Sequence, residues 1–385
     1  MFRTLHNFVF KDKRVLVRLD IDVPLNNDGS ISDDFRLKKA VPTLNFLKDE
    51  GAAQIVMIGH IGRPENNDSS LKTDVVADRF EELLGEKVLK LDNCVDLEIP
   101  KEFRFVMLEN LRFHKDEEKN DEVFSKKLAS FGDLFVLEAF AVSHRRHASI
   151  IGVQKFLPSC AGFQLEKEIN SLDISESEHP VVAILGAAKI HDKIKLVSKL
   201  LEKVDTMILG GAIIFTFYKA KGFEVGKSLV DDSSLEFARQ LSENKKIILP
   251  IDIVVANEIS ENAKTLNVKF NEIPKEYIGL DIGEETIANY KNILKNAKTI
   301  VWNGPMGKFE VKKFEKGTKD LAEFIITLKA KSIVGGGDTA NAVQSFGFED
   351  KFTHVSTGGG ASLQLLEGDT LPGIIALEEN AKKFE

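Results

Sequence analysis

Two glycine-rich segments carry the residues of this chain that are best suited to bind phosphate. One is GGGDT (335–339), directly after the apolar run 331–334, and the other is TGGGAS (357–362), directly after 353–356. Each apolar run predicts a short buried strand, and each tail predicts a helix. Glycine at such a turn lets bare backbone N–H groups face a ligand, and a helix N-terminus adds positive dipole. One run alone would favour a tight turn, whereas two runs at corresponding points favour a phosphate site. Asp338, beside the first run, is placed to hold Mg²⁺ carried by a nucleotide.

Charged side chains in the first half of the chain follow four apolar runs. Asp20 and Asp22 follow the first run, His60 and Arg63 the second, Arg112 the third and Arg145 the fourth, and Arg36 opens the next helix. Any one of these arginines alone would be assigned to the solvated surface. Together they predict a basic pocket for a small polyanion, because guanidinium groups bind such anions through paired hydrogen bonds. Asp20 would orient the arginines or accept from a substrate hydroxyl, and its structural alternative is a buried cap.

Two lysines in the second half open a predicted helix. Lys189 and Lys193 are four residues apart, so they lie on one helix face. At a helix start, two cations on one face are unfavourable unless an anion lies between them. A solvated surface role competes with this interpretation, more strongly for Lys193 than for Lys189.

The elements that must position these residues alternate between strand and helix along the chain. Apolar runs predict strands over 15–19, 54–59, 88–91, 105–108, 134–137, 181–185, 207–209, 247–256, 299–301, 332–334 and 354–356. Amphipathic stretches predict helices over 36–50, 74–84, 121–131, 165–172, 192–201, 234–244, 284–295, 317–328, 340–346 and 361–366. This alternation is typical of parallel sheets covered on both faces. The polar segment 171–180 divides the chain, so we predict an α/β protein with two Rossmann-like, doubly wound parallel-sheet domains joined by a hinge. Ligands of such sheets bind beyond the carboxyl ends of the strands, where the unusual residues of both halves fall.

Composition excludes several classes of protein. The chain has 385 residues, which favours two domains, and its net charge of −8 argues against general nucleic-acid binding. No apolar run reaches the length of a membrane span, and the first residues lack the apolar stretch of a signal peptide. Cys94 and Cys160 form no disulfide framework or metal-binding spacing, which fits a reducing cytoplasm. We therefore expect a cytoplasmic protein that acts on small molecules without nucleic-acid or membrane partners.

The candidate residues include no Ser-His-Asp set, metal cluster or cysteine nucleophile. Phosphoryl transfer needs positioning and charge neutralisation more than covalent chemistry, and an acceptor that is already anionic needs no general base. The sequence thus predicts a basic pocket in one half and a nucleotide-phosphate site in the other.

These motifs, taken in order, resemble those of the phosphoglycerate kinase family over essentially the whole chain. They are VLVRLD (15–20), HIGRP (60–64), ENLRFH (109–114), HRRHAS (144–149), KIHDK (189–193), WNGP (302–305), GGGDT (335–339) and STGGGAS (356–362). The resemblance implies a glycolytic phosphotransferase with a carboxyl group as acceptor. Such an enzyme exchanges a phosphoryl group between 1,3-bisphosphoglycerate and Mg-ADP, giving 3-phosphoglycerate and ATP. It also implies a monomer with two domains, a phosphoglycerate-binding domain over 1–170 and a nucleotide-binding domain over 171–370. The segment 371–385 is expected to pack back on the first domain, and the two domains are expected to close on their ligands.

The resemblance also assigns roles to individual residues. Residues expected to bind phosphoglycerate are Asp20, Asp22, Arg36, His60, Arg63, Arg112 and Arg145. Those expected to bind the nucleotide are Lys189, Lys193, Gly211, Ala212, Asn303, Glu310, Gly337, Asp338 and Thr339, with Asp338 also on Mg²⁺. The catalytic group is expected to be Arg36, Lys189, Gly336 and Gly359.

Several positions depart from the family pattern. The family has asparagine where Asp22 stands, and further departures include Ala141, Val142, Ala187, His191, Ala212, Ile214 and Lys308. Two alternatives therefore stay open: a kinase-like binding or regulatory protein with impaired catalysis, and a small-molecule kinase with a different acceptor. The second rests on Asp22 and on Arg146, which replaces a small residue and would offset the charge of Asp22.

Overall fold

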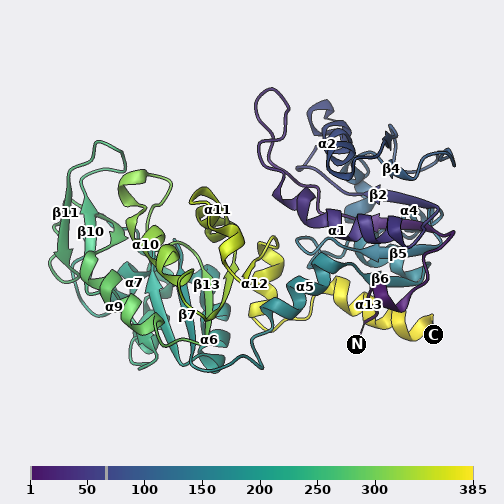
Figure 1. Cartoon of the computed structure of the whole chain (residues 1–385). Coiled ribbons are helices and arrows are strands. Elements are labelled where there is room, and N and C mark those ends of the chain that lie inside the picture. The colour runs from purple at the N-terminus through teal and green to yellow at the C-terminus, as the bar shows by residue number, and fades with distance from the viewer. Residues whose placement is uncertain (1, 66–67, 385) are drawn as a thin grey trace. The chain divides into compact units, whose positions relative to one another are not determined.

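The computed structural model describes residues 2–65 and 68–384, which form two compact units (Figure 1). Unit 1 comprises Met1–Asn170 and Thr370–Glu385, and unit 2 comprises Ser171–Asp369. Each unit contains a six-stranded parallel sheet with helices packed on it, so the predicted doubly wound α/β fold is confirmed. Among the residues described, no helix combines the length and the apolar character that crossing a membrane would require.

The sheet of unit 1 has the strand order β3-β4-β2-β1-β5-β6. Its strands are β1 (Arg14–Arg18), β2 (Gln54–Ile58), β3 (Val88–Lys90), β4 (Phe105–Met107), β5 (Leu134–Leu137) and β6 (Ser159–Ala161). The helices of this unit are α1 (Phe35–Asp49), α2 (Asp74–Leu84), α3 (Lys115–Glu118), α4 (Glu122–Ala129), α5 (Phe163–Leu172) and α13 (Pro372–Lys383). Apolar side chains of β1, β2 and β4 pack against α1 and α2 in one core. Helix α2 ends at Gly85, whose φ of 64° is a left-handed conformation that glycine adopts readily.

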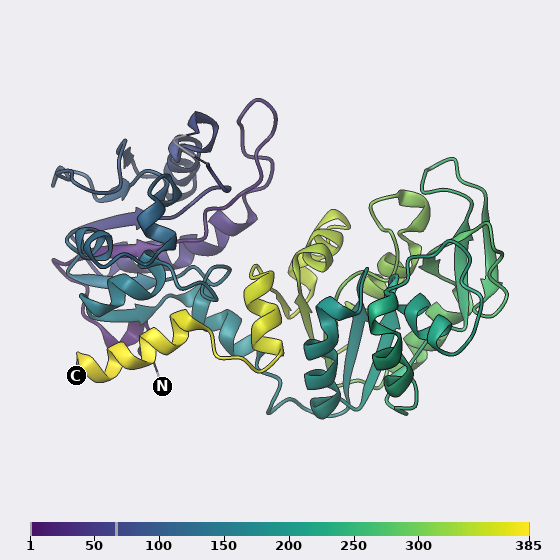
Figure 2. The ribbon, with the colours of Figure 1, turned by 180° about the vertical axis from the view of Figure 1, so that it is seen from behind.

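The C-terminal helix α13 belongs to unit 1 and contacts β6 and the short helical segment η4 (Ala148–Gly152) (Figure 2). Asn380 is buried there, and its Oδ1 accepts from the Ser159 backbone N–H at 2.8 Å. The Arg3 guanidinium donates to the Phe384 carbonyl oxygen at 3.0 Å, so both ends of the chain are tied to one unit.

The main sheet of unit 2 has the order β15-β14-β13-β7-β8-β9. Its strands are β7 (Val181–Gly186), β8 (Thr206–Gly210), β9 (Ile247–Ile248), β13 (Thr299–Asn303), β14 (Lys331–Gly335) and β15 (His354–Val355). The helices are α6 (Ile194–Lys203), α7 (Ile213–Ala220), α8 (Leu235–Leu241), α9 (Glu284–Leu294), α10 (Lys316–Ile325), α11 (Gly337–Ser345) and α12 (Gly360–Leu366). Helices α9, α10 and α11 share one core with β7, β13 and β14.

A second sheet of unit 2 corrects one prediction. Strands β11 (Thr265–Lys269), β10 (Asp252–Ala256) and β12 (Ile278–Ile282) form an antiparallel sheet, drawn in green in Figure 1. The prediction of a single strand over 247–256 is therefore wrong. Pro250 interrupts that run, and proline cannot donate to a strand ladder. The two pieces consequently enter different sheets.

Candidate active site

The carboxyl ends of β1, β2 and β4 bring the predicted basic residues of unit 1 together, as parallel strands must. Asp20 and Asp22 follow β1, His60 follows β2, and Arg112 follows β4. The backbone carbonyl of Asp22 accepts from Arg36 Nη1 at 2.8 Å, which ties the start of α1 to the same place. This cluster combines guanidinium groups, an imidazole and two carboxylates on one edge of the sheet.

His60 lies buried between an arginine and a carboxylate. Its Nδ1 is 2.9 Å from Arg18 Nη2, and its Nε2 is 3.7 Å from Asp22 Oδ2. Burial, reinforced by Arg18 and Arg112, holds the pKa of His60 well below its usual value. The imidazole is therefore neutral at physiological pH and acts as a hydrogen-bonding group.

Asp20 is also buried and has one unused acceptor. Its Oδ2 accepts from the Ala141 backbone N–H at 2.8 Å, whereas its Oδ1 has no hydrogen-bond partner among the described residues. Burial raises the pKa of this carboxyl group, and the nearby Arg36 opposes that change. A hydroxyl group of a bound ligand would satisfy Oδ1, because buried acceptors are rarely left unpaired.

The side chain of Asp22 contacts a backbone group and the imidazole of His60. Its Oδ1 accepts from the Gly62 backbone N–H at 2.8 Å, and Oδ2 faces His60. Arg146, expected to offset this charge, lines a separate cavity beside α13 instead. The negative charge of Asp22 thus remains within the basic cluster.

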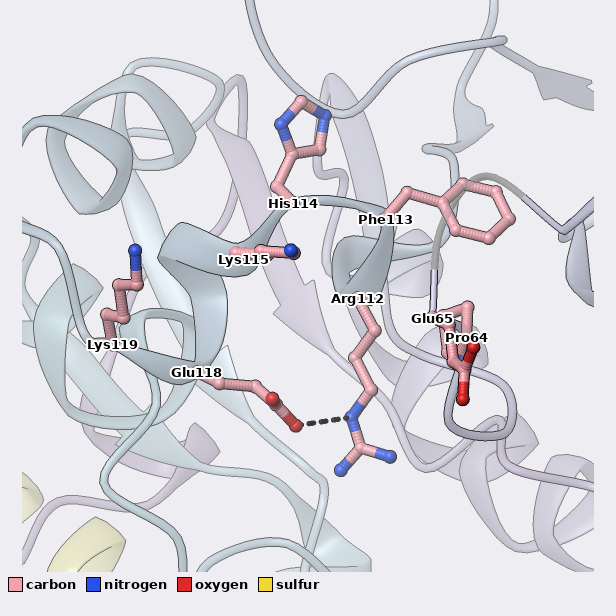
Figure 3. A pocket seen from close by; sticks show the side chains of 8 residues that line it. All are labelled: Pro64, Glu65, Arg112, Phe113, His114, Lys115, Glu118 and Lys119. Carbon is pink, nitrogen blue, oxygen red and sulfur yellow. Dashed lines mark ion pairs between the residues drawn. The ribbon is translucent and has the colours of Figure 1, made fainter.

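Figure 3 shows that Arg112 points toward Glu118. Its Nε lies 3.6 Å from Glu118 Oε1, and its Nη1 donates to the Gly62 carbonyl oxygen at 2.6 Å. Arg63 and Arg145 have exposed side chains, and neither forms an ion pair with a residue that the structure describes. These two cations are accordingly available to an anion in solution.

Replacing Asp22 with asparagine should lower the KM for an anionic acceptor by about three- to tenfold, with little change in kcat. The reason is that Asp22 repels the ligand, although its 38% side-chain exposure allows solvent to screen part of the effect. The difference should shrink as salt is raised. Asp96→Asn makes the same charge change at a surface pair with Lys127 and serves as the control. An equal fall in KM for both variants would contradict a local role for Asp22.

In unit 2, a single cavity of about 720 Å³ gathers all the residues predicted to bind nucleotide. The predicted residues that line it are Lys189, Lys193, Gly211, Ala212, Asn303, Glu310, Gly336, Gly337, Asp338, Thr339 and Gly359. They come from the ends of β7, β8, β13 and β14 and from the segment before α12. Residues separated by up to 170 positions in the sequence therefore meet in one site.

Part of the lining of this cavity is polar and cationic. Lys193 Nζ donates to Asn303 Oδ1 at 3.1 Å, and Asn303 Nδ2 donates to the Gly335 carbonyl oxygen at 2.9 Å. Helix α11 begins at Gly337 beside these groups, after Gly336 with a φ of 89°. A helix N-terminus flanked by lysine favours a phosphate.

Other parts of the lining are apolar, and the sequence did not identify most of them. Phe215, Leu229, Ile259 and Leu280 form them together with Ile214. Leu229 and Ile259 are 46% and 52% exposed. These apolar side chains suit a flat ring. Glu310, expected to bind ribose, pairs here with Lys308 Nζ at 3.1 Å.

Asp338 is the residue that fits a nucleotide-bound Mg²⁺. Its carboxylate is exposed within the cavity, and among residues 2–65 and 68–384 no group of three or more metal-binding side chains is assembled. A single carboxylate is consistent with a metal ion that takes most of its ligands from phosphates and water.

Several departures from the family pattern have partners in the structure. His191 Nδ1 is 2.7 Å from Asp231 Oδ2, which also accepts from the Ser234 hydroxyl. The Ala187 carbonyl oxygen accepts from the Ile213 N–H at 3.0 Å, at the start of α7. Val142 is buried. Val142 thus occupies a packed position, whereas the His191 side chain is 46% exposed and is held by its contact with Asp231.

Sequence reasoning missed three residues behind the basic cluster. Arg18, Glu117 and Ser149 are buried and linked by hydrogen bonds. For Arg18 there was a signal in the sequence, because an arginine ends an otherwise apolar strand. For Glu117 there was no signal, because an acidic run such as 116–118 normally lies in solvent.

A basic anion site in one α/β unit and a nucleotide-sized cavity in another define a small-molecule phosphotransferase. Comparison with known proteins agrees: the family model for phosphoglycerate kinase matches residues 5–369. The chain belongs to the phosphoglycerate kinase family.

Individual relatives support this assignment across the full length. The chain is 46% identical to phosphoglycerate kinase of Dictyoglomus turgidum over 383 residues, covering 96% of each chain. It is 47% identical to the chloroplastic enzyme of Volvox carteri, covering 95% of this chain and 83% of that one. Its fold is similar to the phosphoglycerate kinase structure from Coxiella burnetii, with a TM-score of 0.89, 37% identity and coverage of 99% and 100%.

Proposed function

We propose that this chain is an active phosphoglycerate kinase that transfers a phosphoryl group reversibly between 1,3-bisphosphoglycerate and Mg-ADP. The observation that carries the proposal is the gathering of all predicted nucleotide residues in one cavity, with the basic cluster kept at the strand ends of unit 1. Lys189, Asp338 and Arg36 are retained together with both glycine-rich segments, which favours an enzyme over a regulatory protein that has lost turnover.

In unit 1, the arginines and His60 would bind the phosphoglycerate. Arg63 and Arg145 are exposed cations that suit its phosphate, and Asp20 Oδ1 would accept from its hydroxyl group. Arg36 lies at the start of α1 and would neutralise charge on the transferring group. The acceptor carboxylate is already ionised at neutral pH, so no general base is required.

In unit 2, Lys189 and Lys193 would neutralise the phosphates, and the N–H groups around Gly336 and Gly359 would donate to them. Asp338 would bind Mg²⁺, which when present offsets phosphate charge. The apolar part of the cavity lining would hold the base. Direct transfer requires the two ligands to meet, so the proposal includes a closed state of the two units when both are bound.

A coupled assay with 3-phosphoglycerate and Mg-ATP tests the proposal. We expect turnover that depends on both substrates and that is lost without Mg²⁺. Turnover with another carboxylate or hydroxyl acceptor, but not with 3-phosphoglycerate, would indicate a different small-molecule kinase. Nucleotide binding by calorimetry without any turnover would indicate a binding or regulatory protein.

We also propose a cytoplasmic monomer. Cys94 and Cys160 are both buried and unpaired, and burial raises the pKa of each thiol, so neither is poised to form a disulfide. Light scattering during size-exclusion chromatography would give the mass of a single 42.9 kDa chain.

Ala212→Gly combined with Ile214→Ala should tighten ADP binding by about fivefold, which equals about 1 kcal/mol of relieved crowding. Both side chains line the cavity where the family pattern has smaller residues. These side chains crowd the base of the nucleotide and not its phosphates. Inorganic tripolyphosphate has no base, so its binding should change little. Calorimetry with both ligands measures the difference. Unchanged or weaker ADP binding would show that the pocket is already fitted to these side chains.

A further inference from the structure

A chain of buried polar groups lies directly behind His60. It starts at Arg18, whose side chain is one of the largest that are fully buried in the described residues. Arg18 Nη2 lies 2.9 Å from His60 Nδ1, and Arg18 Nε lies 2.9 Å from Ser149 Oγ. A third contact, from Nη1 to the Leu19 carbonyl oxygen, fixes the plane of the guanidinium. Arg18 is thus held on three sides and has no direct access to solvent.

Ser149 links Arg18 to a buried carboxylate. Its Oγ is 2.5 Å from Glu117 Oε1, and its backbone N–H donates to Glu117 Oε2 at 2.9 Å. A guanidinium has only donors, so Ser149 Oγ must accept from Arg18 and give its own proton to Glu117. Each hydrogen bond that links Arg18, Ser149 and Glu117 therefore has one permitted direction.

Glu117 is the main counterion of Arg18. It is 1% exposed; burial lowers the pKa of Arg18, and Glu117 opposes this more than Asp20 or Asp22 does. A buried guanidinium is costly unless it is paired and hydrogen-bonded, so Glu117 stabilises Arg18 in this orientation. His147 Nδ1 lies 3.8 Å from Glu117 Oε1.

The direction of these bonds determines where His60 carries its proton. Because Arg18 can only donate, His60 Nδ1 must accept, and the proton of the neutral ring lies on Nε2. The Nε2–H group faces the basic cluster, and its distance of 3.7 Å from Asp22 Oδ2 is too long for a hydrogen bond. The Nε2–H donor therefore faces the ligand site and makes no hydrogen bond to Asp22.

We propose that Glu117 and Ser149 are positioning residues which, through Arg18, hold His60 as its Nε2–H tautomer so that it donates to an anionic oxygen of the acceptor. This inference rests on the proposed function for the identity of the acceptor. The tautomer itself depends only on unit 1. In the opposite tautomer, Nε2 would present a lone pair to an anion and repel it.

The test uses the full-length protein with ¹⁵N-labelled histidine. Two-bond ¹⁵N–¹H correlations distinguish the tautomers of each ring, and His60→Gln identifies the His60 signals among those of eight histidines. We expect wild-type His60 to be the Nε2–H tautomer alone. Ser149→Ala breaks the link between Arg18 and Glu117 and should populate the Nδ1–H tautomer as well.

Kinetics provide the second readout. Ser149→Ala should raise the KM for 3-phosphoglycerate by about tenfold, as expected for one charge-assisted hydrogen bond, and leave kcat within about twofold. Ser143→Ala is the matched control: Ser143 is equally buried, but its hydroxyl donates only to the Ala139 carbonyl oxygen at 2.7 Å. The control should change neither the tautomer nor the KM. Glu117→Gln keeps the volume of the side chain while removing its charge, and should reproduce the effect of Ser149→Ala.

Three results would overturn the inference. They are a wild-type His60 that is protonated on Nδ1, a Ser149→Ala protein with unchanged tautomer and KM, and equal changes in Ser143→Ala. If the wild-type protein shows no turnover at all, the proposed function fails. The tautomer of His60 in the wild-type and variant proteins then still decides the inference.

Discussion

Replacing Lys189 with alanine should reduce turnover by about a thousandfold while leaving the affinity for Mg-ADP within about threefold. A cation that meets the transferring phosphoryl group acts mainly in the transition state, and removing one such group typically costs about 10²–10³ in rate, or more in phosphoryl transfer. The structure supports a mobile role for this residue. Lys189 is exposed in the cavity and makes no ion pair within the described residues, whereas Lys193 is held by Asn303 at 3.1 Å.

Lys195→Ala is the control for the loss of a positive charge near the site. Lys195 lies on α6 and pairs with Glu367 at 3.7 Å and also with Asp369, outside the cavity. Its removal should leave turnover unchanged. Steady-state rates and calorimetry on both variants separate the two effects. Near-wild-type turnover of Lys189→Ala would remove this residue from the catalytic group, and a large loss of Mg-ADP affinity would make it a ground-state binding residue.

The placement of the site could be predicted because it follows from strand topology. Asp20 and His60 come directly after apolar runs and Arg112 four residues after another, and the carboxyl ends of parallel strands must lie along one edge. The same reasoning brought Asn303 and Asp338 into one cavity. The order of the strands and helices determines which strand ends lie together, so this placement does not depend on side-chain geometry.

Two kinds of feature could not be predicted in this way. Helix α7 is buried along most of its length, and an apolar segment without a polar face gives no helical period to detect. Strand β11 alternates polar and apolar residues over Thr265–Lys269, but it is only five residues long and nearly every residue is exposed, so it was not predicted. The buried pairing of Arg18 with Glu117 depends on two segments about 100 positions apart, and local sequence carries no signal for such a contact.

Glycine at position 304 should be among the least replaceable residues of unit 2. Its φ is 91°, and a Cβ built there would lie 1.6 Å from the Gly186 carbonyl oxygen. Its N–H donates to Thr339 Oγ1 and its carbonyl oxygen accepts from Trp302 Nε1 at 2.8 Å. Gly304 therefore holds the ends of β7 and β13 close to the start of α11. Lys189 and Lys193 follow β7 and the segment 335–339 leads into α11, so their positions depend on the same contacts. Any shift that relieves the clash must move one of these elements.

Gly304→Ala should lower the free energy of unfolding of unit 2 by about 4 kcal/mol, combining an unfavourable backbone conformation with overpacking against a backbone atom. Trp302 is the only tryptophan and is fully buried, so its fluorescence during denaturation by urea reports this unit directly. Gly335→Ala is the control. Gly335 lies at the end of the neighbouring strand β14, and a Cβ built there would be 3.4 Å from the Leu366 side chain, which is an ordinary van der Waals distance. That variant should lose less than about 1 kcal/mol. Equal stability of Gly304→Ala and the wild-type protein would mean that the ends of β7 and β13 can separate without cost, and the cavity would then not depend on their close approach.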